Sequence, residues 1–494
     1  MSDKTIVGHA QPALSPLTVS ADGRRLVTIQ GEPFFYLADT AWTLPQRLKW
    51  DDALYYMNKR RMQGFTVIQI VALDPERDVD MRDPAGNSAL QGGDLSKPNE
   101  AYFQYLDRLV QAAQDMGLYV MLLPVWGQLV VGESWGGSTF PETVTENNAY
   151  DFGRWIGARY RDRPHIIWCL GGDRQPIHKG IDYRPVWRRM AEGLANGVTG
   201  QNPRWDESSP AWRNLIITYH TCFEMETNEF STMSYWSDDE AWISLILLQS
   251  GHGLMTASYW QVRAEYERSN PMPVLDAEPA YEQMPMNWPQ LFPLHGDWIV
   301  RKRAYWSVLA GAFGHTYGHA SVWCMISEKE RNEVLSASWY EALTHPGAEQ
   351  MTILRDFVES LSFERWVPAQ SMVAHNAKCG HTCLDQHRQA ALDRNGEFAI
   401  VYLTDGGSER VNLAYLSTPD VLGVWFNPRT AETTEPFDVR REPHGNLFEA
   451  PTQGPEQDWL LVLATNRDRL LRLSVRRTWA NPLPSDDMSM IWAE

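Results

Sequence analysis

The sequence predicts a (β/α)8 TIM barrel followed by a C-terminal antiparallel β-sandwich. Short apolar runs alternate with amphipathic stretches of helical length over the first 365 or so residues, and eight of these runs are candidate strands. The remainder holds short strands separated by turn residues, with no helical pattern between them. We expect three parts, an N-terminal extension with a hairpin at residues 1–32, the barrel at 33–367 and the sandwich at 368–494.

The N-terminal hairpin is indicated by turn signals at Asp22-Gly23 and Gly31, and we expect it to plug the bottom of the barrel. The eight barrel strands are predicted at 34–38, 66–71, 118–123, 166–170, 215–220, 231–236, 273–278 and 313–319. The clearest helices are predicted at 51–63, 101–116, 149–163 and 345–361. The sandwich strands are predicted within 397–407, 410–417, 423–430 and 458–464.

Helix boundaries follow from capping residues. Asp51 or Asp52 is expected to cap the helix at 51–63, and Gly64 stands where a left-handed residue ends a helix. Gly117 is expected to end the helix at 101–116 in the same way.

Composition excludes several classes of protein. With 62 acidic and 44 basic residues the formal net charge is −18, which argues against a nucleic-acid partner. No apolar run reaches the roughly 18 residues that a membrane span requires. The first residues show no basic segment followed by an apolar stretch, so we expect no signal peptide and a cytoplasmic location. The 5 cysteines are scattered, which is not typical of a disulfide framework. The sequence carries no signal for an oligomeric state.

Two carboxylates stand at the ends of predicted strands four and seven, Asp173 and Glu278. Reacting groups of such barrels lie at the C-terminal strand ends, and two carboxyl groups about 5 Å apart can run a retaining glycosidase. Asp173 follows an apolar strand that would raise its pKa, so it is the predicted acid/base. Glu278 is the predicted nucleophile, and Glu282 is its rival.

Polar and aromatic residues at the other strand ends predict a carbohydrate-binding crater. Tryptophans at strand ends could stack on sugar rings, whereas Trp155, Trp168 and Trp306 lie within apolar runs and are expected in the core. The candidate substrate-binding residues are Asp39, Trp42, Gln69, Trp126, His220, Tyr235, Trp236, Tyr317, His319 and Trp323. Alternatively, Asp39 caps a turn, and His220 and His319 are hydrogen-bonded core histidines.

Two sets of side chains raise the alternative of a metal site. His315 and His319 could bind metal with His220, but a spacing of four on a strand lacks the shared face of a helical HExxH motif. A second set near the start of the sandwich comprises His375, Cys379, His381, Cys383 and His387, without the CxxC spacing of zinc knuckles. We therefore expect no metal and no cofactor.

Several segments resemble the apiosidase-like glycoside hydrolases of family 140, formerly a domain of unknown function. They are GEPFFYLADTAW, RYRDRPHIIWCLGGD, LLQSGHG, VLDAEPAYE and GHTYGHASVW. The tail, with VYLTDGG, VWFNPRT and DWLLVL, resembles the collagen-binding-type β-sandwich that often follows this domain. The resemblance covers nearly the whole chain in order. His165 departs from it, because the family pattern has Asn before the IIW strand.

The resemblance implies a retaining hydrolase that removes β-linked apiose, a branched furanose, from plant apiosides or pectic oligosaccharides. It matches Asp173 to the family's acid/base and Glu278 to its nucleophile. The missing secretory signal favours small imported apiosides over polymeric pectin. Three alternatives stay open: action on another furanoside such as an arabinofuranoside or galactofuranoside, a non-catalytic carbohydrate-binding barrel, and a metal-dependent hydrolase.

Overall fold

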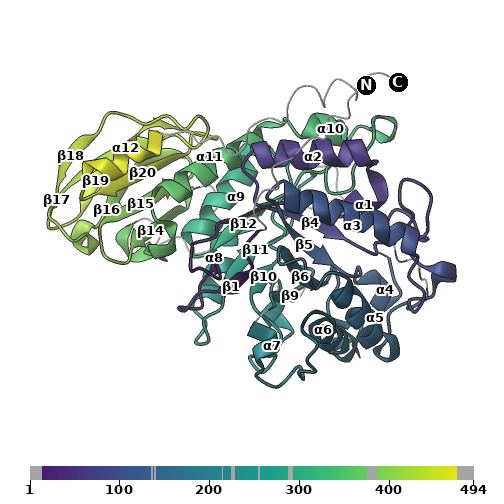
Figure 1. Cartoon of the computed structure of the whole chain (residues 1–494). Helices are drawn as coiled ribbons and strands as arrows, with labels where there is room; N and C mark the ends of the chain where they lie inside the picture. Colours follow the sequence, from purple (N-terminus) through teal and green to yellow (C-terminus); the bar gives the residue numbers. More distant parts are fainter. Residues whose placement is uncertain are drawn as a thin grey trace, which may run out of the picture.

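The computed structural model describes residues 14–134, 137, 139, 141–213, 215–223, 229–253, 256–286, 293–374 and 386–474. Buried strands alternating with helices give the N-terminal part a curled, six-stranded sheet with the order β12-β3-β4-β5-β6-β9, all of its pairs parallel (Figure 1). These strands are β3 (Tyr36–Thr40), β4 (Val67–Val71), β5 (Tyr119–Leu123), β6 (Ile166–Gly171), β9 (Ile217–His220) and β12 (Gly314–Tyr317). Every residue of these six strands is buried, as their apolar runs predict.

A separate parallel pair, β10 (Ile246–Leu248) and β11 (Val274–Asp276), adjoins both edges of this sheet. The Ser244 N–H donates to the Ile217 carbonyl of β9 at 2.8 Å, and the Phe313 N–H beside β12 donates to Val274 at 3.0 Å. The expected barrel is therefore confirmed in part, as a mixed α/β domain with a curled parallel sheet. A closed ring of eight paired strands is not formed by the described residues.

The prediction of the sixth strand at 231–236 is wrong. A short 3₁₀ helix, Thr232–Ser234, occupies that segment, and the strand lies later at β10. The Ser231 side chain caps the 3₁₀ helix, and Thr232 Oγ1 receives the Leu247 N–H at 2.9 Å. The segment thus packs against the strand that it was expected to form.

The longer helices of this domain are α2 (Trp50–Met62), α3 (Glu100–Asp115), α5 (Glu146–Arg159), α6 (Arg184–Thr199), α8 (Ser258–Tyr266), α9 (Asp297–Leu309) and α11 (Pro346–Ser360). Shorter helices are α1 (Leu44–Arg47), α4 (Gln128–Val131), α7 (Pro210–Arg213) and α10 (Trp339–Ala342), and a small hairpin joins β7 (Ile177–His178) to β8 (Ile181–Asp182). Gly64 and Gly117 take the left-handed conformation after α2 and α3, as predicted. Lys49 is the N-cap residue of α2, so the expectation for Asp51 or Asp52 is corrected: both lie in the first turn, where their charge favours the helix dipole.

The hairpin of β1 (Leu17–Val19) and β2 (Leu26–Thr28) forms as expected. Its Leu17 and Leu26 belong to one apolar cluster with Tyr36 and Tyr119, which begin β3 and β5. The hairpin therefore packs at the N-terminal ends of the strands, opposite the ends where Asp173 and Glu278 follow.

The C-terminal part is a separate antiparallel domain. Its six-stranded sheet has the order β13-β14-β15-β20-β17-β18, and β16 pairs with β19 in a second sheet. The strands are β13 (Trp366–Pro368), β14 (Arg388–Asp393), β15 (Phe398–Leu403), β16 (Gly406–Val411), β17 (Asp420–Phe426), β18 (Phe437–Arg440), β19 (Asn446–Gln453) and β20 (Trp459–Ala464), followed by α12 (Arg467–Leu471). One apolar cluster includes residues of both sheets, such as Val401, Leu461, Val411 and Phe448.

The opposite face of the large sheet packs against the α/β domain, and α9 and α11 lie between the two (Figure 1). Tyr402 of β15 stacks on Tyr305 of α9 at 5.3 Å between ring centroids. Arg301 of α9 pairs with Asp458 through two bonds of 2.8 Å, and neither side chain is solvent-exposed. The alternating apolar residues of the sheet are thus buried on both faces.

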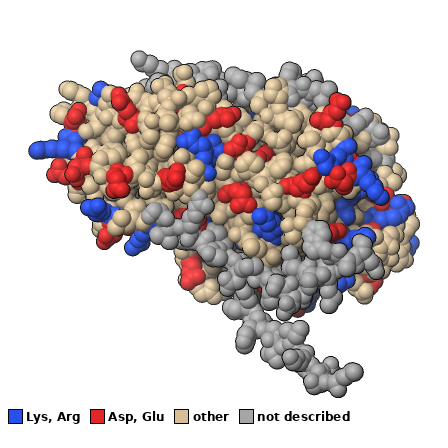
Figure 2. Space-filling model, turned by 90° about the horizontal axis from the view of Figure 1, so that it is seen from above, with Lys and Arg blue, Asp and Glu red and all other residues tan. Residues whose placement is uncertain are grey.

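Acidic and basic side chains are interspersed over the face drawn in Figure 2. Many of the surface charges pair, as where Arg159 contacts both Glu100 and Asp107. Among the described residues, no helix is long and apolar enough to cross a membrane.

Candidate active site

Asp173 stands in a backbone conformation that its two preceding glycines make attainable. Gly171, Gly172 and Asp173 have φ angles of +84°, +98° and +56°. A Cβ atom on Gly171 would lie 2.2 Å from the His220 carbonyl oxygen, and one on Gly172 would lie 2.5 Å from the Trp126 ring. For the aspartate itself, this left-handed backbone costs about 1–3 kcal/mol, and such strain concentrates at functional sites.

Glu278, two residues beyond β11, lies between two histidines. His220 Nε2 is 3.2 Å from Oε2 of Glu278, and His252 Nε2 is 3.4 Å from Oε1. Burial by itself would raise the pKa of Glu278, but the contacts with His220 and His252 outweigh it and hold that pKa below its ordinary value. Glu278 therefore stays ionised, as a nucleophile must.

The pKa of Asp173 is shifted in the opposite direction. Burial raises it first, and the negative charge of Glu278 raises it further, against smaller opposing effects of Arg174, Gln249 and His220. A carboxyl with a raised pKa near one with a lowered pKa is the arrangement that acid and nucleophile roles require.

Two further carboxylates were missed by the sequence analysis: Glu76 interacts with Asp173, and Asp74 interacts with Glu76. Burial, with the charges of Asp74 and Asp173, raises the pKa of Glu76 to about 8, and burial raises that of Asp74 to about 6. Both follow β4, so the strand-end rule applied to Ala72-Leu73-Asp74 could have found them.

Two of the tryptophans predicted to bind substrate lie next to residues that contact Asp173 and Glu278. Trp42 packs against Trp126 at 5.4 Å and edge-on against His220 at 5.6 Å, both measured between ring centroids. Trp323 is half-buried beside this cluster and also packs against the cluster of Tyr281. Among the described residues, the buried Trp126 Nε1 has no hydrogen-bond partner.

Other predicted substrate-binding residues are engaged within the protein. Asp39 accepts from Tyr56 and Arg60, each at 2.6 Å, in a fully buried ion pair. Gln69 donates to Tyr36 Oη at 3.3 Å and Thr316 Oγ1 at 3.0 Å. Asp39 and Gln69 are therefore held by hydrogen bonds within the protein, and none of these bonds involves Glu278.

The end of β12 is held in a similar way. Tyr317 donates to Glu282 at 2.5 Å, and the other carboxylate oxygen of Glu282 accepts the Gly347 N–H at 3.1 Å. His319 Nε2 is 2.9 Å from His345 Nδ1, and its Nδ1 accepts the Ser321 N–H at 3.0 Å. Burial raises the pKa of Glu282, whereas the histidine contacts lower that of Glu278, so the surroundings favour Glu278 over Glu282 as the ionised carboxylate.

Tyr235 and Trp236, predicted at the end of a sixth strand, follow the 3₁₀ helix instead. Trp236 is buried and packs edge-on against Tyr219 and Trp242 in the core. The strand end that belongs in this position carries Gln249 and His252, which the sequence analysis did not select.

Neither metal alternative is supported by the described residues, among which no group of three potential ligands has the geometry of a metal site. His315 is fully buried, and burial together with Arg303 lowers its pKa to about 3. Of the Cys/His segment, only His387 is described, and it stacks on Tyr259 at 3.4 Å; His375, Cys379, His381 and Cys383 lie outside the described residues. His165 Nε2 donates to the Val110 carbonyl at 3.0 Å, before β6 begins, so this departure lies at the other end of the strand from Asp173.

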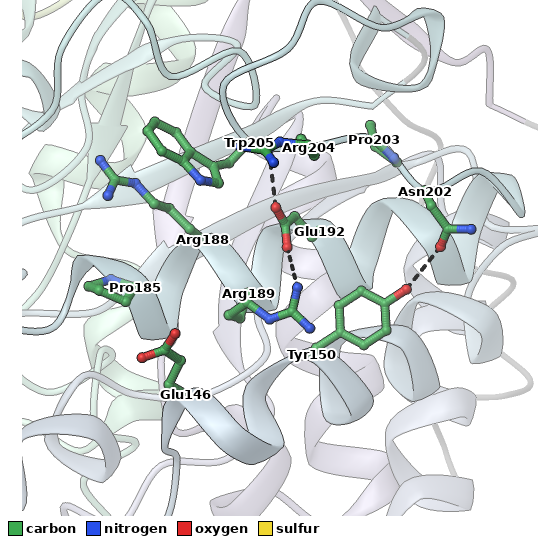
Figure 3. Close-up of a pocket in the computed structure, with 10 residues that line it drawn as sticks. All are labelled: Glu146, Tyr150, Pro185, Arg188, Arg189, Glu192, Asn202, Pro203, Arg204 and Trp205. Carbon is green, nitrogen blue, oxygen red and sulfur yellow. Dashed lines mark hydrogen bonds and ion pairs between the residues drawn. The ribbon is translucent and has the colours of Figure 1, made fainter.

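A cavity of about 510 Å³ lies elsewhere, between α5, α6 and the segment around Trp205 (Figure 3). Its charged side chains are largely paired, with Glu192 contacting Arg189 and the Trp205 N–H. Tyr150 donates to Asn202 at 3.0 Å. The cavity contains neither Asp173 nor Glu278, so we do not assign the reaction to it.

The model of the apiosidase-like catalytic domain matches residues 20–365. The chain belongs to the apiosidase-like family. In this apiosidase-like protein, residues 367–464 also match the collagen-binding domain of a collagenase. No curated protein matches the chain.

Solved structures of glycoside hydrolases share this architecture. A family 5 glycoside hydrolase from Bacteroides vulgatus has a TM-score of 0.77 at 23% identity, and the match covers 96% of this chain and 98% of the other. A second structure, described as a glycoside hydrolase, has a TM-score of 0.76 at 25% identity and covers 91% and 97%. The apiosidase-like protein is accordingly a glycoside hydrolase in fold and family.

Proposed function

We propose that this protein is a retaining β-glycosidase that removes terminal β-linked apiose from plant-derived apiosides or pectic oligosaccharides. The observation that carries the proposal is the different surroundings of two buried carboxyls: Glu278 lies within 3.4 Å of His220 and His252, which lower its pKa, whereas burial and the charge of Glu278 raise that of Asp173. Membership of the apiosidase-like family supports apiose as the sugar. We further propose that the β10–β11 pair completes an eight-stranded barrel, with both carboxyls at its C-terminal end.

The reaction takes two displacements. In the first, a Glu278 oxygen bonds to the anomeric carbon while the glycosidic bond breaks, and Asp173 gives its proton to the departing oxygen. In the second, water attacks the same carbon, Asp173 takes a proton from that water, and the bond to Glu278 breaks. The histidines beside Glu278 keep it ionised before the first step and favour it as leaving group in the second.

A screen of released sugars tests substrate and residues together. Apiin, apiose-bearing pectic oligosaccharides, and aryl arabinofuranosides and galactofuranosides are incubated with enzyme, and the products are separated by chromatography. We expect apiose alone, a rate unchanged by EDTA, and losses of about 10²–10⁴-fold for Asp173→Ala and Glu278→Ala. Release of arabinose or galactose would show that the enzyme acts on that furanoside and not on an apioside. Binding without any product would favour a carbohydrate-binding barrel, and normal turnover by both variants would refute the mechanism.

A further inference from the structure

Gln249 joins the acid/base carboxyl to a fixed point of the backbone. Its Nε2 donates to Oδ1 of Asp173 at 2.7 Å, and its Oε1 accepts the backbone N–H of Phe223. Its own N–H donates to the Phe230 carbonyl at 2.9 Å. Gln249 is buried, so its side chain has little freedom to leave this arrangement.

Hydrogen-bond chemistry fixes the orientation of this amide. The Phe223 N–H can only donate, so the atom facing it must be the amide oxygen, and the NH₂ group must face Asp173. An amide NH₂ group donates hydrogen bonds and cannot accept one. The Asp173 oxygen that it contacts, Oδ1, must therefore be the acceptor and carries no proton. When Asp173 is in its acid form, the proton therefore resides on Oδ2.

We propose that Gln249 is a positioning residue that confines the catalytic proton of Asp173 to Oδ2 and holds that carboxyl for proton transfer. The inference rests on the proposed acid/base role of Asp173. A carboxylic proton restricted to one oxygen is delivered in one direction, which favours transfer to a glycosidic oxygen held in a fixed place.

The segment that carries Gln249 is itself anchored and reaches the second carboxyl. The buried Arg303 donates to the carbonyls of Gly251, at 2.6 Å, and Gly253, at 2.5 Å. The Gly251 N–H donates to the Glu278 carbonyl at 3.1 Å, and His252 lies 3.4 Å from the Glu278 side chain. Residues 249–253 thus orient the acid/base on one side and the nucleophile on the other.

The electrostatic surroundings of Asp173 determine what loss of Gln249 does. The groups that interact with this carboxyl are Glu278, Arg174, His220, Glu76, Cys222, Tyr281 and Gln249. Gln249 donates to the carboxylate and so stabilises the ionised form, as do Arg174 and His220. Without the Gln249 donor, the pKa of Asp173 rises, and the pH at which the acid form is lost rises with it.

Two variants separate positioning from folding. Gln249→Met removes both side-chain bonds, whereas Gln249→Glu keeps an acceptor for the Phe223 N–H and loses the donor to Asp173. Gln261→Met, on α8, controls for loss of a buried glutamine elsewhere. Thermal unfolding of each variant reports whether the fold is retained.

The readout is kcat/KM against pH for phenyl and 2,4-dinitrophenyl β-apiosides. For both Gln249 variants we expect the alkaline limb to move up by about one pH unit. We also expect phenyl apioside, which needs the proton, to lose about 10–100-fold, and the dinitrophenyl substrate less than about threefold. Gln261→Met should behave as the parent enzyme.

The role of Gln249 and the proposed function fail on different results. Equal losses on both substrates with an unmoved alkaline limb would reduce Gln249 to a structural residue and overturn the inference, even if Asp173→Ala is inactive on phenyl apioside. If Asp173→Ala retains full activity on phenyl apioside, the proposed function itself fails.

Discussion

The proposed nucleophile depends on contacts made by single side chains. Glu278 is buried, and burial alone would raise its pKa, yet His220 and His252 within 3.4 Å keep that pKa low. The proposed acid/base depends on Gly171 and Gly172, which allow the chain to enter the left-handed conformation that Asp173 adopts. A Cβ atom on Gly171 would collide with the His220 carbonyl, and one on Gly172 with the Trp126 ring. Steric crowding therefore explains why two glycines precede Asp173.

Replacing His252 tests this account of the nucleophile. His252→Ala removes one of the two contacts that lower the pKa of Glu278, so that pKa rises toward its ordinary value. The active form of Glu278 is ionised and is lost as the pH falls through its pKa, so the acidic limb of kcat/KM should move to higher pH. We expect a loss of about 10–100-fold at neutral pH. The exposed His444→Ala is the control, and an unmoved acidic limb in His252→Ala would contradict the assigned role.

Asp173 was predictable as a candidate because it follows the six-residue apolar strand β6, at a position where barrel enzymes react. Glu278 was predictable as a candidate from the segment 273–278, although the strand within it, β11, has only three residues. Gln249 and His252 were missed for one reason: the sixth strand was placed at 231–236, which moved the expected strand end to Tyr235 and Trp236. Asp39 also looked available in sequence, but its partner Arg60 lies 21 residues away, and no local pattern announces that pair.

At the scale of elements, strands with five or six buried residues were predictable from their apolar runs, as for β4 and β6. The strand β10 has three residues, too few for a period to stand out, and it was missed. The equally short β11 lies within the strand predicted at 273–278. The segment 231–236 has the composition of a strand, but Ser231 and Ser234 form a capping box that favours a helical turn. Local capping overrode β propensity there.

The buried ion pair between Arg301 of α9 and Asp458 of the C-terminal domain is expected to stabilise the folded protein. Asp458→Ala leaves the buried Arg301 guanidinium without its bidentate partner, which should cost about 3–5 kcal/mol. Arg394→Ala breaks an exposed pair with Asp22 that also joins the two parts of the chain, and should cost less than about 1 kcal/mol. Urea unfolding of both variants measures the difference. Equal midpoints would show that the buried pair does not secure the two domains.

Over the whole molecule, the division into an α/β part and an antiparallel part was predictable from the change in pattern near residue 368. The docking of the two was not, because it depends on pairs such as Arg301 and Asp458, 157 residues apart. The large sheet lies against α9 and α11 in a shared apolar cluster, so the C-terminal domain is packed onto the catalytic one and not merely tethered to it.

The central claim is that Glu278 forms the covalent bond to the sugar while Asp173 moves the proton. The most direct measurement is mass spectrometry of the enzyme after incubation with a 2,4-dinitrophenyl 2-deoxy-2-fluoro-β-apioside, followed by peptide mapping. We predict one fluoroapiosyl group on the peptide that contains Glu278, attached at Glu278 itself. A label on Glu282 or another residue, or turnover that releases the inverted sugar without any labelled enzyme, would contradict the claim.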